Sequence, residues 1–362
     1  MKQPSTDKPR SKLEQLRSRT ELAVARSLFG LPTPWQSYIA RGPTLQLDGQ
    51  HLHPDMQLLL ATMRWRGGHP SLAAETVELA RANLREAATR FADAPEVFAV
   101  RNFTIGTPAG RLRVRHYAPN GTRAGTQPLK PLVVFLHGGG FALGDLDTHD
   151  LPCRLLCRSA GAHILSVEYR LAPEHPFPAA LDDGLAAVRW ASEHAEELGA
   201  DPTRLAVAGD SAGGALSAVI ARQCAEQAGP ALRAQLLIYP CTDLLEERPS
   251  RQLFGNGLLL TRTDIAWFNS MYARNIGLGD PRVSPLRAAS LSGSCPAVVV
   301  TCGFDPLRDE GEAYALALRD AGNHVVSWRE PGLLHGFIHC AGVSRHCRDV
   351  VKRMGSELAT LL

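Results

Sequence analysis

One glycine-rich stretch has the residue types that a serine nucleophile needs. It lies between the apolar run 205–208 and the helix-forming run 215–221, and it reads Gly209-Asp210-Ser211-Ala212-Gly213-Gly214. A serine on a tight turn between a strand and a helix exposes its hydroxyl, and small neighbours let the two elements approach closely. The free amides at the start of the helix then face the same space. The stretch therefore predicts that Ser211 is a nucleophile.

A second glycine-rich stretch offers hydrogen-bond donors for such a nucleophile. It follows the apolar run 132–136 and reads His137-Gly138-Gly139-Gly140-Phe141. Consecutive glycines expose backbone amides that can converge on a developing oxyanion. The stretch lacks the Gly-Lys-Ser/Thr ending of a phosphate-binding loop. We expect the amides of Gly139, Gly140 and Ala212 to form an oxyanion hole, and His137 to make a structural hydrogen bond.

The order of residues along the chain selects a base and an acid for Ser211. In a triad on a strand–turn–helix nucleophile the serine comes first, then the acid, then the histidine. Four histidines follow the seventh predicted strand: His324, His335, His339 and His346. His335 lies in the predicted loop 331–337 after the last strand, so we expect it to be the base. Asp305 is the first carboxylate after the strand 297–301, and we expect it to orient His335, with Asp309 as the alternative.

The elements that must position these residues alternate between strands and helices. Eight strands are predicted, at 97–105, 112–117, 132–136, 163–169, 205–208, 235–239, 297–301 and 324–329. The first two alternate apolar and polar residues, which is typical of half-exposed antiparallel strands. The middle ones are continuously apolar, as parallel strands covered on both faces are. With helical stretches such as 182–198 as crossovers, the pattern predicts an α/β fold with a mostly parallel eight-stranded sheet flanked by helices.

Two stretches interrupt this alternation. Residues 1–96 hold no predicted strand, and their apolar periodicity predicts helices at 13–29, 54–66 and 71–91. The second stretch, 242–294, separates two predicted strands and contains a predicted helix at 263–274. We expect residues 1–96 to be an N-terminal extension and helical cap and residues 97–362 to be the catalytic domain. The insertion 242–294 would contribute to the cap and the substrate pocket.

Several side chains are candidates for that pocket. In the insertion Trp267, Phe268, Met271 and Tyr272 recur at helical spacing. They either line an apolar acyl or alcohol pocket or form core beneath a loop. Phe141 and Asp210, within the two glycine-rich stretches, are further pocket candidates. We also expect Arg170 to pair with Glu174 in a turn, and Thr148 or Asp150 to cap a helix at 151–160.

Composition excludes several classes of protein. The 362 residues are 44% hydrophobic and 21% charged, as in an ordinary globular protein, and the net charge of +3 is too small to suggest a nucleic-acid partner. That excess is local, because residues 1–30 carry seven basic and three acidic side chains. The sequence contains no apolar run long enough to span a membrane and no secretory signal, so we expect a cytoplasmic protein. The eight cysteines match no zinc or disulfide spacing, which predicts buried reduced thiols and no metal.

Five blocks of the sequence resemble the hormone-sensitive lipase-like branch of the α/β-hydrolases. They begin at His137 (His-Gly-Gly-Gly), Tyr169 (Tyr-Arg-Leu-Ala-Pro-Glu), Gly209 (Gly-Asp-Ser-Ala-Gly-Gly), Asp305 (Asp-Pro-Leu-Arg-Asp-Glu) and His335 (His-Gly-Phe). The resemblance covers residues 97–362 and implies an α/β-hydrolase fold with a helical cap. It also implies that Ser211, Asp305 and His335 form the triad.

The same resemblance implies a carboxylesterase that hydrolyses short- to medium-chain acyl esters without a cofactor, and it makes a homodimer an expectation to test. Two other functions remain open. An amidase or deacetylase would use the same triad on a different bond, and a ligand receptor on this scaffold would bind without turnover. For a carboxylesterase, the expected partner is a small-molecule ester substrate.

Overall fold

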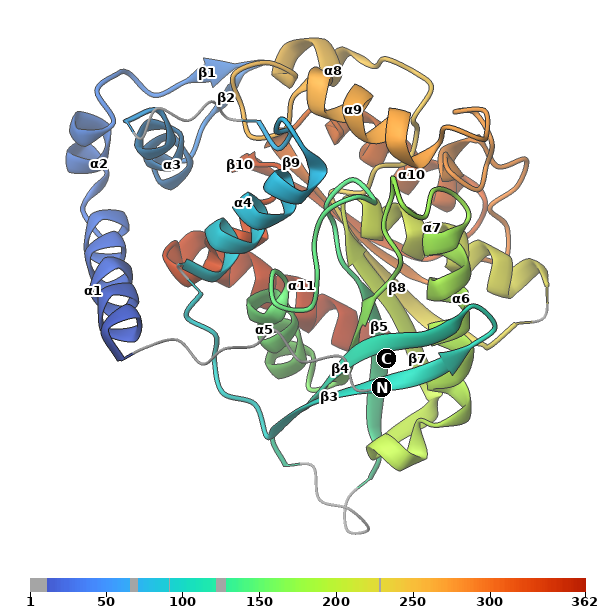
Figure 1. The fold of residues 1–362 in the computed structure, drawn as a ribbon. Helices are drawn as coiled ribbons and strands as arrows, with labels where there is room; N and C mark the ends of the chain where they lie inside the picture. Colours follow the sequence, from blue (N-terminus) through green and yellow to red (C-terminus); the bar gives the residue numbers. More distant parts are fainter. Residues whose placement is uncertain (1–11, 66–70, 91, 122–127, 228) are drawn as a thin grey trace.

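The computed structural model describes residues 12–65, 71–90, 92–121, 128–227 and 229–362, with side chains from Thr20 onward. Its central feature is an eight-stranded sheet of order β10-β9-β8-β7-β5-β6-β4-β3 (Figure 1). The strands are β3 (Ala99–Thr107), β4 (Gly110–Ala118), β5 (Lys130–Leu136), β6 (His163–Glu168), β7 (Ala200–Asp210), β8 (Leu232–Ile238), β9 (Ala297–Phe304) and β10 (Val325–Leu334). Strands β5 to β10 pair in parallel, whereas β3 and β4 are antiparallel. The predicted mostly parallel sheet is confirmed.

Helices cover both faces of this sheet (Figure 1). One face packs against α6 (Ala179–Glu193), α7 (Ala212–Glu226) and α10 (Arg308–Asp320), and the other against α5 (Asp150–Ala160) and α11 (Arg345–Leu361). In β5 the side chains alternate between the two cores, with Val134 on the α6–α7 side and Val133 and Phe135 on the α5–α11 side. Because both faces are buried, the strand needs no polar residues, which explains its continuously apolar sequence.

The N-terminal segment is mostly helical. It contains α1 (Lys12–Phe29), α2 (Thr33–Ile39), α3 (Pro54–Trp65) and α4 (Val77–Arg90). The prediction of no strand here is wrong, because β1 (Gln46–Leu47) and β2 (Gln50–His51) form a short antiparallel hairpin. Asp48 and Gly49 connect them with φ of 53° and 70°, as a two-residue hairpin turn requires. Strands of two residues are too short to show a period of apolar residues.

Helix α4 also begins later than predicted. Residues 71–73 are bound by Asp264 of the insertion, whose Oδ1 accepts hydrogen bonds from the Ser71 hydroxyl at 2.6 Å and from the Ala73 amide at 2.8 Å. Thr76 Oγ1 then accepts the Leu79 amide at the start of α4. The predicted helix ends at 66 and 91 lie outside the described residues.

The insertion between β8 and β9 holds three short helices: α8 (Pro249–Phe254), α9 (Arg262–Tyr272) and the 3-10 turn η2 (Pro285–Arg287). Two further 3-10 turns are η1 (Glu196–Leu198) and η3 (Phe337–Gly342). The predicted helix 182–198 is in fact α6 followed by η1. Among the described residues no helix is both long and apolar enough to cross a membrane. All eight cysteines are buried free thiols, as predicted.

Two predicted polar contacts are wrong. Arg170 pairs with Asp183 at 2.9 Å, and Glu174 pairs with Arg81 at 2.7 Å, so the two residues do not pair with each other. Helix α5 begins at Asp150 and has no side-chain cap, because the Thr148 hydroxyl instead hydrogen-bonds with the backbone of Asp145. Arg170 and Glu174 each pair with a residue further away in the sequence. The Thr148 hydroxyl is used in a local turn with Asp145 and does not cap the helix.

Candidate active site

Ser211 is the single residue that connects β7 to α7. Its φ of 54° is a left-handed conformation that a non-glycine residue adopts only where its surroundings enforce it. The Ser211 amide donates to Ile238 O at 2.8 Å, and its carbonyl accepts from the Ala215 amide at 3.0 Å. Gly213 is needed beside it, because a Cβ there would lie 1.9 Å from Leu136 O. The turn is therefore fixed by its neighbours on β8, on α7 and on β5.

The predicted base lies next to this serine, and the predicted acid lies next to the base. His335 Nε2 is 2.9 Å from Ser211 Oγ, and His335 Nδ1 is 2.8 Å from Asp305 Oδ2. Asp305 is fully buried, and its Oδ1 accepts the Leu307 amide at 2.8 Å. Ser211, Asp305 and His335 directly follow the last residues of β7, β9 and β10. The three side chains therefore meet at the carboxyl edge of the parallel strands, and β10 includes residues 331–334, which were predicted to be loop.

The alternative acid, Asp309, is engaged elsewhere. Its Oδ2 accepts the Ser250 amide at 2.8 Å, and its Oδ1 accepts from Arg308 at 2.8 Å. Asp309 thus ties the insertion to the start of α10. These contacts favour Asp305 as the residue that orients His335.

The glycine-rich turn after β5 presents free amides near Ser211. Gly139 and Gly140 have φ of 117° and 60°, and Phe141 follows with 62°. Gly139 O accepts the amides of Ala142 at 3.1 Å and Leu143 at 2.8 Å, which closes the turn. Among the described residues, no acceptor is found for the amides of Gly139, Gly140 and Ala212. Three unpaired donors are therefore available to a ligand oxygen.

Asp210 lies beneath this turn. Its Oδ1 accepts the Gly138 amide at 2.8 Å and is 3.2 Å from His149 Nε2. Burial alone would raise the pKa of Asp210, yet His149 and the Gly138 amide lower it to about 2. The contact with Gly138 holds the glycine-rich turn, so it favours a positioning role for Asp210 over the predicted place in the substrate pocket. The sequence carries no local signal for the His149 contact, because it joins the end of β7 to the residue before α5.

His137 behaves as a structural residue. Its ring is fully buried, stacks on Tyr169 with centroids 4.3 Å apart, and has Nδ1 2.9 Å from Gly138 O. Burial lowers the pKa of His137 to about 4. A neutral ring bonded to the backbone agrees with the structural role expected from the sequence.

One group of potential metal ligands occurs within the part of the chain that the structure describes: His149, Asp210 and His339. Their ligand atoms lie within 4.8 Å of one another. Burial, with a smaller contribution from His149, lowers the pKa of His339 to about 3, so its ring is a neutral donor. Asp210 already accepts the Gly138 amide, and we assign no ion to this group.

The aromatic pocket candidates divide into two sets. Phe141 and Tyr272 are buried and stack on each other with centroids 3.7 Å apart, which places them in the core. Phe268 lies directly over the oxyanion turn, because a Cβ on Gly140 would be 2.2 Å from its ring. Trp267 and Met271 are half-buried around the same core. Phe268, itself buried, is therefore the member of the predicted stripe that packs against the glycine-rich turn.

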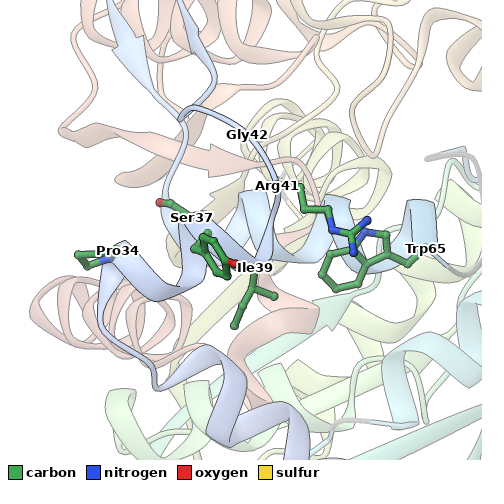
Figure 2. Close-up of a pocket in the computed structure, with 7 residues that line it drawn as sticks. Pro34, Ser37, Ile39, Arg41, Gly42 and Trp65 are labelled. Atoms are coloured by element: carbon green, nitrogen blue, oxygen red, sulfur yellow. The ribbon is translucent and has the colours of Figure 1, made fainter.

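A cavity lies elsewhere, in the N-terminal segment (Figure 2). It has a volume of about 860 Å³ and is lined by Pro34, Ser37, Tyr38, Ile39, Arg41, Gly42 and Trp65. Every predicted site residue is described by the structure, and none of them lines this cavity. The cavity is therefore separate from the serine site.

Known proteins resemble this chain over most of its length. Residues 133–339 match the family described as alpha/beta hydrolase fold. Carboxylic ester hydrolase LipN of Mycobacterium tuberculosis is 47% identical, over 85% of this chain and 83% of its own. Esterase LipI of the same organism is 42% identical over 72% and 81%. The structure of an ester hydrolase from the metagenome of Lake Arreo superposes with a TM-score of 0.81 at 40% identity, covering 85% of this chain and 98% of that one.

Proposed function

The chain belongs to the hormone-sensitive lipase-like branch of the α/β-hydrolase family, and from that premise we propose that it is a serine carboxylesterase acting on short- to medium-chain acyl esters. Relatives named as ester hydrolases support the esterase activity. The mechanism rests on one observation, the hydrogen-bonded series Ser211–His335–Asp305. His335 Nε2 is 2.9 Å from Ser211 Oγ, and His335 Nδ1 is 2.8 Å from Asp305 Oδ2.

In the proposed reaction, Ser211 Oγ attacks the ester carbonyl carbon while His335 Nε2 accepts its proton. Asp305, buried and bonded to His335 Nδ1, holds the ring in the required tautomer and stabilises the imidazolium. The tetrahedral oxyanion accepts hydrogen bonds from the amides of Gly139, Gly140 and Ala212, which donate no hydrogen bond to any other described residue that would have to break first.

His335 then donates the proton to the departing alkoxide, and an acyl-enzyme ester on Ser211 remains. Water enters, loses a proton to the same imidazole nitrogen, and attacks the acyl carbon. Collapse of the second tetrahedral intermediate releases the carboxylic acid and returns the proton to Ser211. No further reactant is needed, because each proton that His335 accepts is returned within the cycle.

We propose further that residues 97–362 carry this chemistry and that residues 1–96, with the insertion 242–294, cover the site. The position of Phe268 over Gly140 supports a role for the insertion in selecting the acyl or alcohol group. The homodimer and the cytoplasmic location stay predictions from the sequence.

The experiment compares wild type with Ser211→Ala on 4-nitrophenyl esters of two to twelve carbons. We expect Ser211→Ala to lose at least about 10⁴-fold in kcat, since removing a triad serine costs powers of ten. Ser217→Ala is the matched control, because it removes a buried hydroxyl six residues later, in α7, that donates to Gly213 O. An organophosphate should label Ser211 alone, and labelling of another residue would contradict the proposal.

The same panel separates the two alternatives. Matched 4-nitroanilides test for an amidase, which would hydrolyse them at rates comparable with the esters. A receptor without turnover would release no burst of nitrophenol from a short-chain ester. Hydrolysis confined to the esters, with a burst, is the expected result.

A further inference from the structure

Arg81 of the N-terminal segment hydrogen-bonds to the backbone immediately after the oxyanion turn, by which we mean residues Gly139, Gly140 and Phe141. Arg81 lies on α4, and its Nε donates to Ala142 O at 2.8 Å. Its Nη2 donates to Ala172 O at 2.9 Å. Ala142 follows Gly139, Gly140 and Phe141 directly, so the contact is made at the end of the turn whose amides face the serine. Figure 1 shows α4 beside the loop that follows β5.

The guanidinium is itself held in place. Both nitrogens Nη1 and Nη2 bond the two oxygens of Glu174 at 2.7 Å, in the paired geometry that arginine makes with a carboxylate. This partner lowers the pKa of Glu174 to about 2. Only about a quarter of the Arg81 side chain is exposed, at 27%. Arg81 is therefore fixed by one anion while it donates to two carbonyls.

The two carbonyls belong to one connected backbone unit. The Ala172 amide donates to Phe141 O at 2.9 Å, so the chain around Ala172 already holds the oxyanion turn from one side. Arg81 adds a second link between that chain and the turn, because it donates to both Ala172 O and Ala142 O. Three consecutive residues of the turn have left-handed φ, and Phe141 pays a steric cost for it. A strained turn keeps its shape only while such contacts over-determine it.

We propose that Arg81 is a positioning residue for the reaction, through which helix α4 holds the amides of Gly139 and Gly140 in the direction that the oxyanion requires. The inference rests on the proposed esterase function and adds a residue from outside the catalytic domain. Arg81 acts through the turn and does not touch the substrate.

The test uses the full-length chain and the variants Arg81→Ala and Arg81→Lys. We expect Arg81→Ala to lower kcat about 10- to 100-fold with little change in KM, somewhat less than the roughly 10²–10³ lost when one oxyanion donor is deleted outright. Arg81→Lys keeps the charge beside Glu174 but not the fork that reaches both carbonyls, so it should lie between Arg81→Ala and wild type.

Arg85→Ala is the matched control. Arg85 is one turn further along α4, is more than half exposed, and pairs with Asp145 at 2.5 Å. Its removal takes the same charge from the same helix and leaves the Arg81 contacts to Ala142 O and Ala172 O in place. Asp145, whose side chain is 14% exposed, keeps its hydrogen bonds from the amides of Asp147 and Thr148. We expect its kcat to stay within about threefold of wild type.

A second readout separates positioning from a loss of folded enzyme. Each variant is assayed on a 4-nitrophenyl ester and on its thionoester, in which a sulfur replaces the carbonyl oxygen. Sulfur is a weak hydrogen-bond acceptor, so the thionoester gains less from the oxyanion amides. Misdirected amides therefore lower the ratio of ester to thionoester rates, whereas a smaller fraction of folded enzyme leaves that ratio unchanged.

A lowered ratio in Arg81→Ala, with Arg85→Ala like wild type, is the expected result. An Arg81→Ala enzyme that matches Arg85→Ala in kcat, or that loses activity at an unchanged ratio, would overturn the inference. If Arg81→Ala fails to fold, the ratio in Arg81→Lys decides in the same way. Titration with an organophosphate counts working serines in each variant, so failure of the Ser211 assignment is recognised separately.

Discussion

Gly213→Ala tests whether the close contact between α7 and β5 is what aims Ser211. A Cβ at this position would lie 1.9 Å from Leu136 O and 2.6 Å from His137 O. Both are backbone atoms, one at the end of β5 and the other in the residue that follows it. Because Cβ contacts essentially never fall below 3.0 Å, helix and strand must separate by about 1 Å. Misplacement by that distance can cost about 10²-fold in rate, and overpacking typically costs about 1–3 kcal/mol of stability.

We therefore expect Gly213→Ala to lose about 10²-fold or more in kcat/KM and to unfold several degrees below wild type. The measurements are ester hydrolysis, corrected by organophosphate titration, and thermal unfolding. Gly214→Ala is the comparison, since its Cβ would lie 3.0 Å from Pro240 Cβ and 3.2 Å from Gly209 O, so its neighbours need to move by only a few tenths of an ångström. We expect it to keep at least a tenth of the activity. A Gly213→Ala enzyme that does the same would refute the argument.

Two other predictions concern the acid and the buried histidines. Asp305→Asn should lower kcat about 10⁴-fold, because the amide favours the wrong tautomer of His335, whereas Asp309→Asn should change ester hydrolysis less than tenfold. Burial lowers the pKa of His116 to about 3 and of His163 to about 4, each helped by neighbouring cations, and His116 Nε2 lies 2.9 Å from His163 Nδ1. Between pH 6.5 and 4 the unfolded chain takes up protons that these rings do not, so the midpoint of thermal unfolding should fall as pH falls. His163→Gln, which cannot be protonated, should show a shallower fall; an identical slope would contradict this.

The strands and the three aligned site residues could be predicted because their signals are local. A strand buried on both faces must be continuously apolar, and 132–136 and 297–301 are. A serine between a strand and a helix needs glycines where backbones touch, and Gly213 sits against Leu136 O. Chain order then limits the choice of histidine and acid, because in a parallel sheet the ends of successive strands meet at one edge.

The polar contacts could not be predicted, because each joins segments that are far apart in sequence. Arg170 and Glu174 are four residues apart and opposite in charge, yet Asp183 and Arg81 are their partners. The start of α4 was misplaced for the same reason, since Asp264 of the insertion binds the preceding residues. A single sequence contains no periodicity that reports such pairs, and only the packed fold brings them together.

Contacts of this kind also link residues 1–96 to residues 97–362. The proposed nucleophile, acid and base all come from residues 97–362, but the N-terminal segment contacts the strands that carry them. The His53 amide donates to Gly332 O at 2.9 Å on β10, shortly before His335. Asp48 pairs with Arg308 at 2.7 Å, just after Asp305. With Arg81 on the oxyanion turn, the segment therefore supports the base, the acid and the oxyanion donors at once. A cap that only admitted substrate would need none of these contacts, so we expect the two parts of the chain to work as one unit.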